Sequence, residues 1–232
     1  VLLARTGQEL FLRTVLRSST LSRAALSSDV LRRLLSAGPS FREMGVFFQL
    51  LSYLQATSGD EEPEYPLILV DMPATGHTLS LTSLPDLLLR LVPRGPIAVA
   101  LRAGQSYLND PAQAAAWVVT LPETLPISEC LELVEGLERT KVPVGGIILN
   151  RIPVDPYTPR ERAGLAPLLV GNDTLGTESF RKPLLAARET ARLRAGTNAR
   201  IYALPEVPHR GLIAGLTEEL LRAQPIERGT GA

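Results

Sequence analysis

Residues 65–78 read YPLILVDMPATGHT, and the predicted fold is organised around this stretch. Residues 67–70 are four consecutive apolar residues, with Pro66 before them and a loop containing proline and glycine after them. A short uninterrupted apolar run with such flanks is typical of a strand buried on both faces, as in the middle of a parallel sheet. The run ends in Asp71, and helix-compatible sequence resumes at Thr78. The pattern therefore predicts a buried strand, a carboxylate at its end, and a loop leading into a helix.

Asp71 would lie where open parallel sheets bind their ligands, in the crevice beyond the carboxyl ends of the strands. A carboxylate at that position either contacts a ligand or caps the segment that follows it. Gly76 and His77 favour the first interpretation. Glycine permits close approach of the backbone to a ligand, and histidine can donate or accept a proton.

The second half of the chain alternates between strand and helix patterns. Apolar runs predict strands at 115–120, 146–150 and 201–204, and helical patterns lie at 129–139, 160–169, 184–195 and 212–223. Ser128 is a plausible N-cap for the first of these helices. Strands separated by a helix of this length imply a right-handed βαβ crossover. The fold class predicted is therefore α/β, with a mostly parallel sheet flanked by helices.

The first half of the chain is predominantly helical outside residues 65–78. Leucines recur at three- and four-residue spacing through residues 1–56, and 41–56 is apolar nearly all round. That segment is either a buried helix or a surface for an apolar client or a partner subunit. Helical patterns at 79–92, with a predicted break at Pro85, and at 97–108 complete a helical lobe.

Composition restricts the classes of function. The 232 residues contain 24 basic and 24 acidic side chains, and this neutral balance argues against a broad nucleic-acid interface. No apolar run approaches the roughly 20 residues of a membrane span, and no secretion signal is visible, so we expect a cytoplasmic protein without a transmembrane segment. Cys130 is the single cysteine, which excludes an intrachain disulfide or a multi-cysteine metal site, and we expect it in the core.

Several segments together resemble the ArsA-type ATPases, which include the arsenite-pump ATPase and its relatives that target tail-anchored membrane proteins. Residues 71–79, DMPATGHTL, resemble the D-[TA]-x-P-T-G-H-T-L signature of that family, with Pro-Ala where many members have Ala-Pro. Residues 118–123, 146–150 and 204–206 resemble its V-T-x-P-E segment, its I-I-x-N strand and its late nucleotide-base loop. The resemblance covers roughly residues 5 to 222.

This resemblance implies a P-loop NTPase fold of the MinD/ArsA type and an ATP-hydrolysing switch protein that uses ATP and Mg²⁺. Asp71 would hold the magnesium ion, and Thr75, Gly76 and His77 would sense the γ-phosphate. The adenine base would be bound by Asn150 and Arg151, together with Leu204, Pro205 and Glu206. The family also implies a homodimer or a heterodimer with a paralogue, and an apolar client or membrane-protein partner.

The same resemblance implies one incomplete ATPase domain. Residues 1–58 and 79–112 would form the helical lobe, 65–78 and 113–225 the α/β nucleotide-binding core, and 226–232 a tail. The phosphate-binding motif G-x-x-x-x-G-K-[ST], its Lys-Gly-Gly variant and a first-switch aspartate are not found in the sequence. Because the chain also opens with Val1 rather than Met, we expect the C-terminal portion of a longer ATPase, which binds ATP poorly and does not hydrolyse it.

Two alternatives stay open. The chain is a non-catalytic pseudo-ATPase or interaction module that pairs with an intact ATPase, or an unrelated α/β cofactor binder that uses Asp71 by convergence. An arsenite role has no support in the cysteine content, because soft thiolate ligands for such an anion are missing.

Overall fold

The computed structural model describes residues 39–58, 62–72, 75–91, 93–169, 176–207 and 212–226. The helices predicted before residue 39, and all but the first residue of the predicted tail, lie outside these ranges. The described chain divides into two compact units. The helical unit extends to Ala114 and includes Thr140–Pro143, and the α/β unit comprises Ala115–Arg139 and the residues from Val144 onward. Residues 65–72, which we expected in the α/β core, belong to the helical unit.

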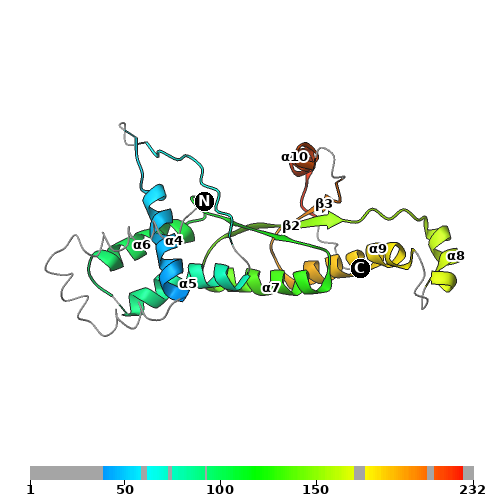
Figure 1. Cartoon of the computed structure of the whole chain (residues 1–232), viewed down its shortest axis with the longest axis horizontal. Helices are drawn as coiled ribbons and strands as arrows, with labels where there is room; N and C mark the ends of the chain where they lie inside the picture. Colours follow the sequence, from blue (N-terminus) through cyan, green and yellow to red (C-terminus); the bar gives the residue numbers. More distant parts are fainter. Residues whose placement is uncertain are drawn as a thin grey trace. The chain divides into compact units, whose positions relative to one another are not determined.

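Three helices form the core of the helical unit (Figure 1): α4 (Pro39–Leu54), α5 (Thr75–Leu91) and α6 (Pro96–Asn109). Their buried apolar residues are Phe47, Phe48, Leu81, Leu84, Leu88 and Leu101. The rings of Phe47 and Phe48 meet edge to face, with centroids 6.2 Å apart. This packing confirms the buried-helix interpretation for the middle of residues 41–56, because Phe47, Phe48 and Leu51 are buried, whereas Tyr53 near the end of the helix is exposed.

The break predicted at Pro85 is wrong, since α5 continues through this residue to Leu91. A proline inside a helix costs about 3 kcal/mol, because it removes one backbone hydrogen bond and crowds the preceding turn. Pro85 is fully buried beside Leu84 and Leu88, and burying one large apolar side chain contributes about 1.5–3 kcal/mol. Burial of several such residues along α5 is therefore sufficient to offset the proline.

The buried strand predicted at residues 67–70 is also wrong. This stretch is in no strand, and the side chains of Leu67 and Leu69 are 75% and 87% exposed. Exposure alternates along it, since Ile68 and Val70 are half-buried, as in an extended segment with one face on the protein. A strand needs a neighbour to satisfy its backbone N–H and C=O groups. No strand lies beside it among the described residues of the helical unit, so the run stays unpaired.

The α/β unit contains a three-stranded parallel sheet in the order β1-β2-β3. Along the chain its elements are β1 (Ala116–Thr120), α7 (Thr124–Arg139), β2 (Val144–Ile152), α8 (Pro159–Leu169), α9 (Thr177–Gly196), β3 (Ile201–Pro205) and α10 (Leu212–Arg222). Val118 pairs with Ile147, and Ile147 pairs with Ile201. The predicted strands at 115–120, 146–150 and 201–204 and the parallel α/β architecture are confirmed.

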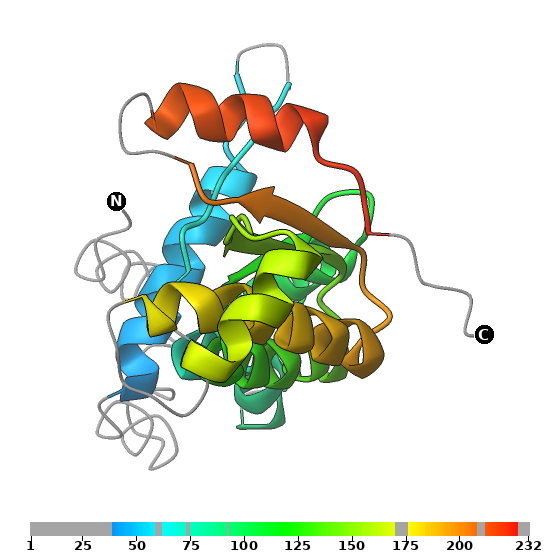
Figure 2. The same ribbon diagram turned by 90° about the vertical axis from the view of Figure 1, so that its right-hand side faces the viewer.

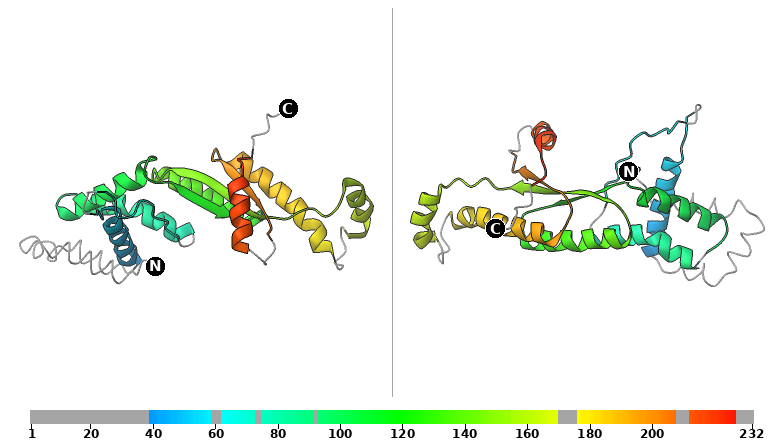
Figure 3. Two further views of the ribbon diagram at one scale, coloured as in Figure 1. Left: turned by 90° about the horizontal axis from the view of Figure 1, so that it is seen from above. Right: turned by 180° about the vertical axis from the view of Figure 1, so that it is seen from behind.

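Helices α7 and α9 lie together on one face of the sheet, and α10 lies on the other face next to β3 (Figures 1, 2 and 3). The residues facing α7 and α9 include Val118, Ile147 and Leu149, all buried. On the opposite face the rings of Trp117 and Tyr202 meet across β2, with their centroids 5.4 Å apart. In the described ranges no helix combines the length and the apolar character that crossing a bilayer would take.

Two helix starts in this unit differ from the sequence predictions. Helix α7 begins at Thr124, so Ser128 is not its N-cap but lies one turn inside, where its Oγ donates to the Thr124 carbonyl at 3.0 Å. Pro126 does not prevent the earlier start, because a proline in the first turn loses only an amide that has no helical partner. Helix α9 likewise begins at Thr177, earlier than the predicted 184, and includes Pro183.

Candidate functional site

The carboxyl ends of the three parallel strands lie along the same edge of the sheet, and we call this edge of the α/β unit the ligand edge. β2 departs from regular pairing at this point. Leu149 pairs with Ala203 and Ile152 with Pro205, so that two residues of β2, Asn150 and Arg151, lie opposite the single residue between them on β3. This is a β-bulge, a feature that re-aims side chains and is frequent beside active sites.

The backbone of the bulge is in an uncommon conformation. Arg151 has φ = 56°, in the left-handed region that residues other than glycine seldom adopt. The Arg151 backbone N–H donates to Oδ1 of Asn150 at 2.9 Å, which satisfies this amide and orients the Asn150 side chain. The side-chain amino group of Asn150 has no hydrogen-bond partner among the described residues, and the Arg151 side chain is exposed. Two side chains that offer donors are thus presented at the ligand edge.

The loop after β3 lies next to the bulge. The Glu206 backbone N–H donates to the Ile152 carbonyl at 3.0 Å, and the Glu206 carboxylate pairs with Lys182 of α9 at 3.3 Å. Leu204 is buried in the core, so its side chain supports the loop from within, whereas Pro205 is half-buried and Glu206 is exposed. All five residues predicted to bind the base are therefore brought together in one place.

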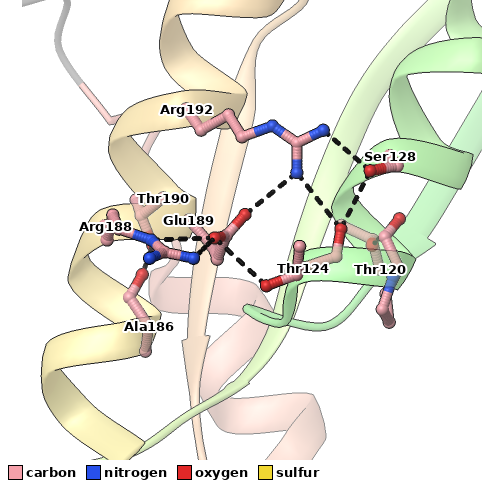
Figure 4. A network of polar contacts seen from close by, with 9 residues as sticks. Thr120, Thr124, Ser128, Ala186, Arg188, Glu189, Thr190 and Arg192 are labelled. Carbon is pink, nitrogen blue, oxygen red and sulfur yellow. Dashed lines mark hydrogen bonds and ion pairs between the residues drawn. The ribbon is translucent and has the colours of Figure 1, made fainter.

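The loop after β1 is held by a polar network that the sequence did not predict (Figure 4). Its central group is the carboxylate of Glu189 on α9, whose side chain is only 1% exposed. This carboxylate accepts hydrogen bonds from Thr124 Oγ1 at 3.2 Å and from Arg192 Nη1 at 3.1 Å. Arg188 pairs with the same carboxylate at 2.7 Å. Arg192 also donates to the Thr124 carbonyl at 3.2 Å and to the Ser128 hydroxyl at 2.7 Å.

Electrostatics keep this buried carboxylate ionised. The hydrogen bond from Arg188 is the main cause that lowers the pKa of Glu189 below its usual range, with the bonds from Arg192 and Thr124 acting in the same direction. Burial opposes them, because removal from water disfavours the charged form. A buried charge persists only when it is paired and hydrogen-bonded, and that condition is met here.

Arg162 joins the loop after β2 to the start of α9. Its guanidinium pairs with Asp155, donates to the Phe180 carbonyl at 3.0 Å, and lies over the rings of Tyr157 and Phe180. The hydrogen bond from Arg162 lowers the pKa of the Asp155 carboxyl. The segment from Asp155 to Tyr157 is therefore fixed by charge and by aromatic stacking together.

The residues predicted to act on phosphate and magnesium belong to the other unit. Asp71 is exposed in the helical unit, just before α5. Thr75, Gly76 and His77 form the first turn of α5, and their side chains lie outside the described residues. Within the described ranges no three His, Cys, Asp or Glu side chains gather into a metal-binding group. Each unit thus carries one part of the predicted site, and the roles of these residues stay predictions.

The helical unit also contains an open polar hollow of about 440 Å³. It is lined by Asp86, Arg102, Gln105, Ser106, Asn109 and Lys141. None of these was predicted as a site residue. Three of the lining side chains are already hydrogen-bonded, since Arg102 donates to the Pro93 carbonyl at 2.7 Å and Gln105 donates to Asp86 at 2.6 Å.

Proteins named ATPases match part of this chain. ATPase BagA of Mycobacterium tuberculosis is 36% identical to it over 89 residues, which are 38% of this chain and 26% of that relative. A protein of Mycobacterium bovis, whose name gives the ATPase assignment as provisional, is also 36% identical to this chain. The match covers the same shares of the two chains. No protein-family model matches the chain. The matched segment is thus about a quarter of the length of these curated relatives.

Glu189, Arg192, Arg162 and Lys182 are the residues of the ligand edge that sequence reasoning missed. The sequence RETAR at 188–192 has a usual surface pattern, with opposite charges at i,i+3 spacing on a helix. Arginine-rich helix faces are usually solvated, and the side chains of Arg188 and Arg192 are indeed 69% and 43% exposed, but Glu189 is buried. An acidic residue flanked by arginines was the only local signal, and burial came from packing against α7.

Proposed function

We propose that this chain is part of an ATP-dependent switch protein of the ArsA type, in which ATP hydrolysis drives a conformational change used to handle an anion or a client. The observation that carries the proposal is the bulge at Asn150 and Arg151, which lies beside the loop at Glu206 on the carboxyl edge of a parallel sheet. This is the place where open α/β sheets bind nucleotides. The similarity to proteins named ATPases supports the same class of ligand.

Asn150 would recognise the adenine base. Its Oδ1 is engaged by the Arg151 backbone N–H, so its amino group remains as a donor for a ring nitrogen of the base. Arg151 would contact the base or the nearby sugar and phosphate oxygens through its planar guanidinium. Pro205 and the backbone of Glu206 would form the adjoining wall, with Leu204 holding that loop from the core side.

Asp71 would hold Mg²⁺. A hard dication of this kind takes oxygen ligands and commonly keeps several waters, so one exposed carboxylate fits as its protein ligand. When bound, the ion supplies neutralisation of charge on the β- and γ-phosphates. The first turn of α5, with Thr75, Gly76 and His77, would sense the γ-phosphate, because helix N-termini favour anions.

The route from nucleotide to movement would run through α5. Its first turn contains the proposed sensor, and its later turns contribute Leu81, Leu84 and Leu88 to the core of the helical unit. A shift of the first turn on loss of the γ-phosphate would therefore change how α5 packs in this core. An apolar client and a second copy or a paralogue are the partners we propose for the moving unit.

The catalytic part of the proposal is tested in the full-length protein. We expect Asp71→Asn to abolish Mg-dependent phosphate release with no change in the circular dichroism spectrum, because an amide loses the charge that holds the metal. Asp86→Asn, an exposed carboxylate of the same unit outside the proposed site, is the matched control. Unchanged turnover in the Asp71 variant would count against the assigned role. The 232-residue chain alone should show no turnover, and measurable Mg-dependent hydrolysis by it would refute that expectation.

The base-binding part is tested by affinity. We expect Asn150→Ala to weaken binding of a fluorescent ATP analogue roughly three- to tenfold, as for loss of one hydrogen bond of about 1 kcal/mol. Asn109→Ala, an amide side chain in the polar hollow of the other unit, should leave the affinity unchanged. Equal losses in the two variants would remove the reason for placing the base at the bulge.

A further inference from the structure

The loops that follow all three strands at the ligand edge are fastened to the same helix, α9. The loop after β1 is held at its end, where Glu189 and Arg192 bond Thr124, the first residue of α7. The loop after β2 is held through Arg162, which bonds both Asp155 and the carbonyl of Phe180. The loop after β3 is held through the ion pair of Lys182 with Glu206. Each of these attachments alone is ordinary. Together they connect all three loops to one helix, α9.

The attachment points follow the geometry of α9. Lys182 and Glu189 are seven residues apart, which is close to two full turns, so both side chains leave the helix on nearly the same face. Their spacing along the axis is roughly 10 Å at 1.5 Å per residue. Arg192 follows Glu189 by three residues and extends the same face by almost one turn. One face of a single rigid helix therefore sets the spacing between loops that are far apart in sequence.

We propose that α9 is the positioning element of the ligand edge and that Glu189 is its central residue, so that the three loops around a bound nucleotide keep a fixed spacing. This inference rests on the proposed function for the identity of the ligand. Glu189 is suited to the role because a buried carboxylate held by Arg188 and Arg192 of its own helix and by the Thr124 hydroxyl of α7 has one satisfied geometry, and departures from it leave a charge unpaired. Glu189 is a positioning residue, since it acts on the ligand only through Thr124 and its loop.

Hydrogen exchange measured by NMR on the 232-residue chain tests the positioning without any nucleotide. One hydrogen-bonded backbone amide reports on each loop: Glu123 after β1, Tyr157 after β2 and Glu206 after β3. We expect Glu189→Gln to speed exchange at all three on the order of tenfold, because local opening governs such rates. The matched control is Glu135→Gln, which breaks an exposed ion pair with Arg139 on α7 and should change none of them. Faster exchange at Glu123 alone, or at none of the three, would overturn the proposal.

Two arginine variants separate positioning from simple neutralisation of the buried charge. Arg188 contacts Glu189 but not α7, whereas Arg192 bonds Glu189, Thr124 and Ser128. Arg192→Gln should therefore loosen the three loops more than Arg188→Gln does, although each removes one positive charge. Equal effects of the two variants would mean that only the neutralisation of the Glu189 charge matters. That result would contradict the positioning role of Glu189.

Affinity for a fluorescent ATP analogue supplies the second readout. We expect Glu189→Gln to raise Kd roughly tenfold relative to the unchanged chain and to Glu135→Gln, because a small misplacement of contacting groups weakens an oriented complex strongly. Loosened loops with unchanged affinity would contradict the link to the ligand. If the full-length protein binds no nucleotide at all, the proposed function fails, and the exchange rates of the 232-residue chain still decide whether α9 positions the loops.

Discussion

At the scale of single residues, burial has opposite effects on two ionisable side chains of the α/β unit. Cys130 and Glu189 are both almost inaccessible to solvent, at 3% and 1%. Cys130 has no charged partner, and burial raises the pKa of its thiol to about 11. The guanidinium of Arg188 lowers the pKa of Glu189 despite its burial. The first side chain is therefore neutral and inert at physiological pH, and the second stays charged.

We predict that the Cys130 thiol does not react in the folded protein. A pKa of about 11 instead of the ordinary 9.0 reduces the thiolate fraction at pH 8 roughly 100-fold, and only the thiolate is nucleophilic. Burial of the sulfur slows access further. Labelling with a chromogenic disulfide reagent should be slow at pH 8 and become complete in denaturant. Rapid labelling of the native protein would show that α7 does not hold this residue in the core.

At the scale of elements, the central strand β2 depends on two adjacent glycines. A Cβ at Gly146 would lie 2.8 Å from a Trp117 ring carbon and 3.0 Å from a Tyr202 ring carbon. These two rings come from β1 and β3, the strands on either side of β2, and they meet over one face of β2. A Cβ at Gly145 would lie 2.9 Å from the indole nitrogen of Trp117. Glycine at these positions is needed for space, since neither has a positive φ.

We therefore predict that Gly146→Ala destabilises the protein by about 1–3 kcal/mol, the usual cost of overpacking a core. Gly164→Ala on α8 is the matched control, because its Cβ would meet no atom within 4 Å. Alanine there should be neutral or stabilising by up to about 1 kcal/mol, as expected for helix propensity. Urea denaturation measures both variants. A stable Gly146→Ala protein would mean that the rings of Trp117 and Tyr202 can move apart freely.

At the scale of the whole molecule, the two units differ in how their apolar strand-like segments are protected. The strands of the α/β unit are joined in one sheet, and the outer edge of β3 is further covered by Pro225 and Ile226. Residues 67–70 of the helical unit have similar composition but no strand partner among the described residues of that unit, and Leu67 and Leu69 are exposed. Sequence composition alone makes these segments look alike.

Limited proteolysis should distinguish these segments. We predict that thermolysin, which cleaves before apolar residues, cuts the native chain at Ile68, Leu69 or Val70 well before it cuts within β1 or β2. Exposed backbone without hydrogen-bonded neighbours is open to a protease, whereas paired strands must first unfold. Mass spectrometry of the early fragments gives the positions. Early cuts in β1, or resistance of residues 67–70, would contradict the unpaired state of this segment.

Much of the α/β unit could be predicted from its sequence because its signals are local. Short apolar runs at β1, β2 and β3, separated by helical patterns, indicate strands and imply parallel connections. The same reasoning failed at residues 67–70, where an apolar run indicates the capacity to form a strand but not the presence of a partner. It failed at Pro85 for a related reason, since a local breaker was outweighed by packing in the core.

The sequence by itself determined the alternation of helices and strands, the neutral charge, the buried single cysteine and the polar residues at the strand ends. Only the tertiary structure decided that Asn150 and Arg151 form a bulge beside Glu206, and that Glu189 is buried against the start of α7, 65 residues away. The physical reason is that periodicity and propensity act within a few residues. Strand pairing and charge burial depend on which distant segments meet, and the residues next to a given position in the sequence do not determine those contacts.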